Sequence, residues 1–218
     1  MNEKVKKMTT VAMLCALAYL VMLIIRFPLV AAIPFVKYDP KDIVISIGGF
    51  IFGPVTSFAI SVIVSLIEMV TVSESGPIGC LMNVISTCSF TCTAAYIYKK
   101  KHSIKGAVTG LIVGTLTMTA TMLLWNYLIT PIYMGFPRQA VAEMLLPCFL
   151  PHNLLKGAIN AAVTMLIYKP VVSGLRRGHL IADTKKSEKK SNVGVMLVTA
   201  AILITCIFVV LVLNGTLK

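Results

Sequence analysis

Charged side chains are scarce in this 218-residue chain, where only 13% of residues carry a charge, yet four of them occur within one stretch of eight. Residues 35–42 read FVKYDPKD and contain Lys37, Asp39, Lys41 and Asp42, with a formal charge of zero. Such a balanced set can pair internally as a solvated turn, or it can form part of a site for a ligand without net charge. This stretch alone supports both interpretations equally.

A second polar group lies in PHNLLKGAIN, residues 151–160. Asn153, Lys156 and Asn160 are spaced i, i+3 and i+7, which places them on one face of a helix. Pro151 precedes them, so the row occupies the first two turns. A lone lysine here could simply extend toward the membrane surface, but two amides on the same face favour an inward row of donors and acceptors.

Trp125 and Asn126 form a third group near the end of another apolar stretch. A single Trp at such a position is more often an anchor at the membrane interface, and taken alone this interpretation is preferred over a wall for ring stacking. The three groups together predict an apolar pocket with several hydrogen-bonding groups and little net charge. Such a pocket suits a small, neutral, partly aromatic ligand better than an ion.

Glu68 stands apart from these groups. The sequence offers Lys37 or Lys156 as its partner, or a place at the membrane boundary, and does not choose among them.

The elements that position these groups are predicted to be membrane-spanning helices. Hydrophobic residues make up 57% of the chain, more than a water-soluble domain of this size buries, and a bilayer requires about 20 apolar residues per helix. We therefore expect an all-α integral membrane protein, with Gly53-Pro54 separating a short helix from a longer one and with Pro131 and Pro170 near helix ends. The expected helices cover residues 8–28, 43–52, 55–73, 77–98, 105–129, 152–170 and 193–213. The expected organisation is a membrane domain (1–175), a basic cytoplasmic linker (176–192) and an extra C-terminal transmembrane helix (193–218).

The net charge of +12 does not indicate nucleic-acid binding, because the Lys and Arg residues lie in short clusters between apolar stretches. Most of the 20 fall on the cytoplasmic side if the N-terminus is cytoplasmic, as the positive-inside rule requires. This orientation places FVKYDPKD and the C-terminus outside.

Motifs for catalysis or ATP binding are missing from the sequence. There is no GxxxxGK[ST], HExxH or GxSxG, and the six cysteines include no CxxC, so we expect neither an enzyme nor a metal site. A solute-binding protein without its own energy source needs a partner. Ala12 and Ala16 form an AxxxA pattern in the first apolar segment, which allows another helix to approach closely.

On AxxxA, FVKYDPKDI, GGFIFGP and PHNLLKGAIN, the chain resembles the substrate-binding S-components of energy-coupling factor (ECF) vitamin transporters, specifically the riboflavin-binding type, over residues 8–175. The resemblance implies a six-helix vitamin binder in the bacterial cytoplasmic membrane that faces outward. It also implies a transmembrane coupling protein and two cytoplasmic ATPase subunits as partners, with the alanine motif facing the coupling protein, and a body that topples in the membrane to deliver its ligand.

Carried over to this chain, the resemblance assigns Lys37, Asp39 and Asp42 to the loop that covers or lines the flavin site. It assigns the ring edge and the ribityl chain to four partners, namely Asn126, Asn153, Lys156 and Asn160, with Trp125 available for stacking. The extra C-terminal helix departs from the family's six. An S-component for FMN or another vitamin, and a flavin-holding membrane protein that serves electron transfer, stay open as alternatives.

Overall fold

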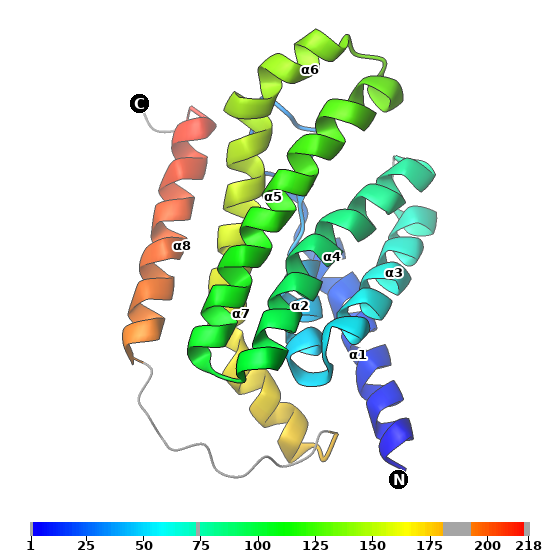
Figure 1. The fold of residues 1–218 in the computed structure, drawn as a ribbon, viewed down its shortest axis with the longest axis vertical. Coiled ribbons are helices and arrows are strands. Elements are labelled where there is room, and N and C mark those ends of the chain that lie inside the picture. Colours follow the sequence, from blue (N-terminus) through cyan, green and yellow to red (C-terminus); the bar gives the residue numbers. More distant parts are fainter. Residues whose placement is uncertain (1, 73–74, 181–192, 216–218) are drawn as a thin grey trace.

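The computed structural model describes residues 2–72, 75–180 and 193–215 (Figure 1). Six helices form a bundle, and a seventh, α8, lies beside it. The bundle helices are α1 (Glu3–Ile24), α2 (Lys41–Phe52), α3 (Pro54–Thr71), α4 (Gly76–Lys101), α5 (Ile104–Met134) and α7 (Leu150–Arg177), and α8 is Val193–Leu213. A short α6 (Arg138–Met144) and a π-helical turn, η1 (Leu145–Phe149), lead into α7. The predicted all-α membrane protein, a six-helix bundle with one additional C-terminal helix, is confirmed.

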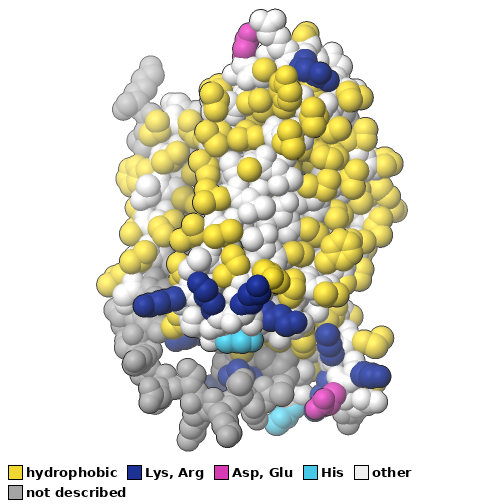
Figure 2. Space-filling view, viewed as in Figure 1, with side chains coloured by type: hydrophobic (Ala, Val, Ile, Leu, Met, Phe, Trp, Pro, Cys, Tyr) yellow, Lys and Arg dark blue, Asp and Glu magenta, His cyan; other side chains and the backbone are white. Residues whose placement is uncertain are grey.

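The described residues include six helical segments long and apolar enough to cross a membrane, one of which joins α6, η1 and α7. Helix α2, with 12 residues, is too short to span on its own. Figure 2 shows apolar side chains around the body of the molecule, with most of the visible Lys and Arg side chains toward the end that carries the N-terminus. The chain is a multi-pass membrane protein.

The break between α2 and α3 lies where the sequence predicts it. Gly53 has φ of 95°, a left-handed value that glycine adopts without a Cβ clash, and Pro54 begins α3 with a suitable fixed φ. Two other proline predictions are wrong: α5 continues past Pro131 and α7 past Pro170. A helix within a bundle tolerates the one hydrogen bond that proline removes, and buried Val172 and Leu175 pack the last turns of α7 in place.

Helices α7 and α5 approach each other closely at Gly157. A Cβ on Gly157, the residue after Lys156, would lie 2.4 Å from Thr115 Cγ2 on α5, so any larger residue here would force the helices apart. This contact sets the rotation of α7 and turns Lys156 and Asn160 into the bundle, where they are 6% and 0% exposed.

The connection between α1 and α2, residues 25–40, is partly packed into the molecule and partly exposed. The first predicted span ends at Ile24, four residues early, because Phe27–Pro28 (β1) pairs antiparallel with Lys37–Tyr38 (β2). Between these strands, Leu29, Val30 and Ile33 are buried. They belong to a hydrophobic cluster that also contains Tyr38, Val141, Phe149, Leu155 and Cys206.

Helix α8 packs against α7 and lies across the molecule from α1 (Figure 1). Ala12 and Ala16 are exposed on α1. The additional helix α8 therefore does not cover Ala12 and Ala16, which we call the alanine surface. The basic linker predicted for 176–192 falls partly within α7, which extends to Arg177, and residues 181–192 lie outside the described residues.

Candidate functional site

The first turn of α2 carries buried charges that meet a carboxylate on α3. Lys41, the first residue of α2, is 0% exposed. Its Nζ lies 2.5 Å from Glu68 Oε2 and 3.6 Å from Asp39 Oδ2. Arg26 approaches the other oxygen of Glu68 at 3.7 Å and reaches the Val72 carbonyl at 3.4 Å. Charges from the 25–40 connection, α2 and α3 thus converge.

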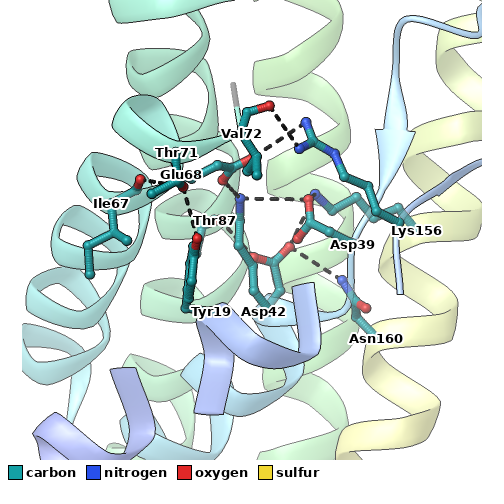
Figure 3. A network of polar contacts seen from close by, with 12 residues as sticks. Tyr19, Asp39, Asp42, Ile67, Glu68, Thr71, Val72, Thr87, Lys156 and Asn160 are labelled. Atoms are coloured by element: carbon teal, nitrogen blue, oxygen red, sulfur yellow. Dashed lines mark hydrogen bonds and ion pairs between the residues drawn. The ribbon is translucent and has the colours of Figure 1, made fainter. Parts of the chain in front are cut away.

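The row on α7 meets the same charges from the opposite side (Figure 3). Lys156 Nζ lies 3.4 Å from Asp42 Oδ2 and 3.9 Å from Asp39 Oδ2. Asn160 Nδ2 donates to Asp42 Oδ2 at 3.3 Å, and the Thr87 hydroxyl on α4 donates to Asp42 Oδ1 at 2.7 Å. Asp42 therefore joins α2, α4 and α7.

Tyr38 connects strand β2 to the α7 row by a hydrogen bond. Its hydroxyl donates to Asn160 Oδ1 at 2.9 Å, and its ring lies 5.4 Å from that of Phe27. Burial raises the pKa of Tyr38 above its ordinary value, so the hydroxyl is protonated at neutral pH and acts as a donor.

We call the six converging charges the charge network. Its three cations and three carboxylates cancel, as burial demands, because an unmatched buried charge is strongly destabilising. Burial raises the pKa of the Asp39 carboxyl, but the neighbouring cations outweigh that effect and the net pKa lies below its ordinary value. Asp39 is thus an anion at neutral pH. The network members are Arg26, Asp39, Lys41, Asp42, Glu68 and Lys156.

Two buried polar atoms, one on the network member Asp39 and one on the neighbouring His152, have unused hydrogen-bonding capacity. Within the described part of the chain, Asp39 Oδ1 and His152 Nδ1 are buried and accept or donate no side-chain hydrogen bond. Asp39 Oδ1 can accept a hydrogen bond from an N–H or O–H group, and His152 lies one helical turn before Lys156. The charges of the described network are therefore all paired, whereas Asp39 Oδ1 and His152 Nδ1 keep unused hydrogen-bonding capacity.

Of the predicted site residues, the structure brings together Asp39, Asp42, Lys156 and Asn160. The other four lie differently. Lys37 is half-buried in β2, and Asn153 donates to the Phe149 carbonyl one turn earlier. Asn126 donates to its own helix and accepts from Thr130. Trp125 packs, partly buried, against a separate hydrophobic cluster. Contact of all eight with a ligand stays a prediction.

Sequence reasoning missed part of the network. Neither partner offered for Glu68 is the one it contacts, since Lys41 and Arg26 take that place. The sequence predicts Lys41 in the loop but not in the site, and it gives no indication of Thr87 or Tyr38. The available signals were a lysine directly before Asp42 at a helix start and an arginine directly after the first apolar segment.

Comparison with known proteins adds an independent line of evidence. The family described as "ECF transporter, substrate-specific component" matches residues 6–168. The riboflavin transporter RibU of Staphylococcus aureus is 32% identical over 178 residues, covering 79% of this chain and 93% of that protein. The riboflavin transporter FmnP of Bacillus subtilis is 32% identical over 189 residues, covering 81% and 99%.

A solved structure has a similar fold. It is described as the S component of a bacterial ECF transporter, and it superposes with a TM-score of 0.68 and 30% identity. The superposition covers 80% of this chain and 99% of that one. The family match ends at residue 168, so the last turns of α7 and all of α8 lie beyond it.

Proposed function

Because the chain belongs to the substrate-specific components of ECF transporters, we propose that it binds riboflavin at the outer face of the membrane for ATP-driven import. Proteins named riboflavin transporters are similar over about four-fifths of the chain. The role is capture and release of the vitamin, with no covalent bond made or broken.

The observation that carries this proposal is the convergence of the 25–40 connection with the α7 row on a network of zero net charge. Riboflavin is uncharged, and its flat ring carries two carbonyls and one N–H, while its ribityl chain carries hydroxyls. Lys156 and Asn160 supply donors for the carbonyls, and Asp39 Oδ1 supplies an acceptor for an N–H or O–H group. In this proposal, Asn153 on α7 and Asn126 and Trp125 on α5 also contact the ligand, although the structure does not join them to the network.

The connection 25–40 acts in this proposal as the cover of the site. Asp39 lies at the end of the cover that leads into α2, and it contacts cations from both α2 and α7. When the cover moves, Lys156 exchanges its contact with the Asp39 carboxylate for one with a ligand carbonyl. The lysine charge therefore has a polar partner throughout. Lys37, at the rim of the cover in β2, contributes to closing it.

The partners follow from the family and from the surface of α1. The chain contains no ATP-binding loop, so a coupling protein and two cytoplasmic ATPase subunits supply the energy. Ala12 and Ala16 form the surface for the coupling protein. The gathering of Lys and Arg at the N-terminal end (Figure 2) supports a cytoplasmic N-terminus. In this proposed orientation, the charge network belongs to the outer half of the bundle.

Purification tests the proposal directly. Expressed in membranes and purified in detergent, the protein should carry a yellow ligand, and after removal of that ligand it should quench the fluorescence of added riboflavin with one-to-one stoichiometry. A colourless protein that quenches no riboflavin fluorescence would contradict the function.

The charge network also predicts selectivity against phosphorylated flavin. FMN adds about 1.5 to 2 negative charges at pH 7, whereas all three network cations already lie within 4.0 Å of a carboxylate. Bringing that phosphate to the site without a matching cation is unfavourable, so we expect FMN to bind at least about tenfold more weakly, a difference of about 1.4 kcal/mol. Competition against bound riboflavin measures the ratio. Equal affinities would show that the phosphate is accommodated away from the network.

A further inference from the structure

The end of α8 is bonded to the backbone of the cover. The Ala31 N–H donates to Asn214 Oδ1 at 2.9 Å, and Asn214 Nδ2 donates to the Leu29 carbonyl at 3.4 Å. A single side chain thus holds both a donor and an acceptor of the cover, although Asn214 is more than 180 residues away in the sequence. Asn214 directly follows α8, which ends at Leu213.

Below Asn214, apolar side chains of α8 complete the hydrophobic cluster beneath the cover. Cys206 is 6% exposed within that cluster, and Val210 packs against it. Most other large side chains of α8 are exposed, including Ile204, Phe208 and Val212. The contact of α8 with the cover is therefore specific to one face and to its C-terminal half.

The same cluster contains Tyr38, which directly precedes Asp39 in the sequence. The hydroxyl of Tyr38 donates a hydrogen bond to Asn160 on α7. Movement of Leu29, Val30 and Ile33 away from α8 would open the packing around Tyr38 and loosen Asp39 from Lys156. The path from α8 to the charge network thus runs through packed side chains and one backbone segment, with no intervening helix.

From these contacts we propose that α8 positions the cover of the binding site, and that Asn214 is its positioning residue. The helix lies beyond the family match, so it is an addition to the shared six-helix body. It stabilises the closed cover and thereby slows exchange of the bound ligand. The link to ligand exchange rests on the proposed riboflavin function, whereas the link to the cover does not.

Hydrogen exchange of the ligand-free, full-length protein in detergent tests the contact. Asn214→Leu keeps a side chain of similar size and removes both hydrogen bonds. We expect amides of residues 29–33 to exchange about fivefold to tenfold faster in this variant. Peptides from α4 should keep their protection, which distinguishes local opening of the cover from general destabilisation.

Two further variants are matched to the first. Asn214→Asp retains the acceptor for the Ala31 N–H and should recover most of the protection. Thr205→Val removes the hydroxyl of an exposed α8 side chain that donates to the Ala201 carbonyl of its own helix, and should leave the cover unchanged. Unaltered exchange at residues 29–33 in Asn214→Leu overturns the proposal, whether or not riboflavin binds.

Release of bound riboflavin tests the functional half. In the presence of excess competitor, Asn214→Leu should release riboflavin about fivefold faster than the unmodified protein, and Thr205→Val should not. Faster amide exchange without faster release overturns the link between α8 and the site. Failure of the unmodified protein to bind riboflavin contradicts the proposed function instead, and the exchange experiment still decides the contact.

Discussion

Replacing Lys156 with methionine is expected to weaken riboflavin binding by at least about tenfold and to lower the free energy of unfolding by about 3–5 kcal/mol, the usual cost of breaking a buried ion pair. Methionine approximates the length of lysine but removes the charge, leaving Asp39 and Asp42 without their α7 cation. It also removes a donor proposed for a ligand carbonyl. Fluorescence quenching measures the affinity, and denaturant unfolding in detergent measures the stability.

Lys105→Met is the matched control, because Lys105 is an exposed lysine in the first turn of α5 and lies outside the network. It should change neither quantity. Combining Lys156→Met with Asp42→Asn restores the charge balance, so the double variant should be less destabilised than the sum of the single changes by about 1 kcal/mol or more. Strict additivity would show that the two side chains do not interact, and unchanged affinity in Lys156→Met would remove Lys156 from the site.

The double variant Ala12→Leu with Ala16→Leu is expected to retain riboflavin binding and to lose uptake. Both alanines are exposed on one face of α1, in line with Met8 and Leu20, which are 72% and 53% exposed. Two leucines would hold a partner helix away from this surface, because small residues are what permit close packing between membrane helices. Uptake is measured in cells that also produce the coupling protein and the ATPases.

Ala200 and Ala201 provide the control for that experiment. They are exposed alanines on α8, and substituting both with leucine adds the same volume on the opposite side of the molecule from α1. This control should transport normally. Normal uptake by the α1 variant would show that the alanine surface is not where the coupling protein binds.

The charge network also clarifies how a neutral vitamin can be held by charged residues. Each cation contacts a carboxylate, so the site presents polar groups without net charge. The same pairs join the cover, α2, α3 and α7. In the proposed site, ligand exchange involves rearranging contacts that also hold the bundle together. A helix that positions the cover, as proposed for α8, would then act directly on the rate of exchange.

The sequence predicted the helices well where their ends depend on local features. The α8 segment 193–213 agrees with the structure at both ends, and the Gly53-Pro54 break is correct. The errors occur where tertiary contacts override a local signal. Pro170 does not end α7, because packing beyond it stabilises the last turns, and the first span ends early because β1 pairs with β2.

The candidate site also contains some residues that local sequence features indicate and others that only tertiary contacts decide. The i, i+3, i+7 spacing on α7 identified Lys156 and Asn160, because residues on one helix face stay together in any fold. Asn126 satisfies its amide within its own helix, and no pattern of spacing indicates that choice in advance. The selection of Lys41 rather than Lys37 as a network member depends on where β2 ends and α2 begins.

Membrane insertion, the order of the helices and the polar face of α7 are therefore consequences of local composition and periodicity, which are fixed along the chain. The pairing of Glu68 with Lys41 and Arg26, the burial of residues 38–42 and the bonding of Asn214 to the cover are decided only by tertiary structure. These contacts join residues from 27 to more than 180 positions apart. Buried charges must pair with whichever opposite charges the packed helices bring within reach, and that choice exists only once the helices have packed.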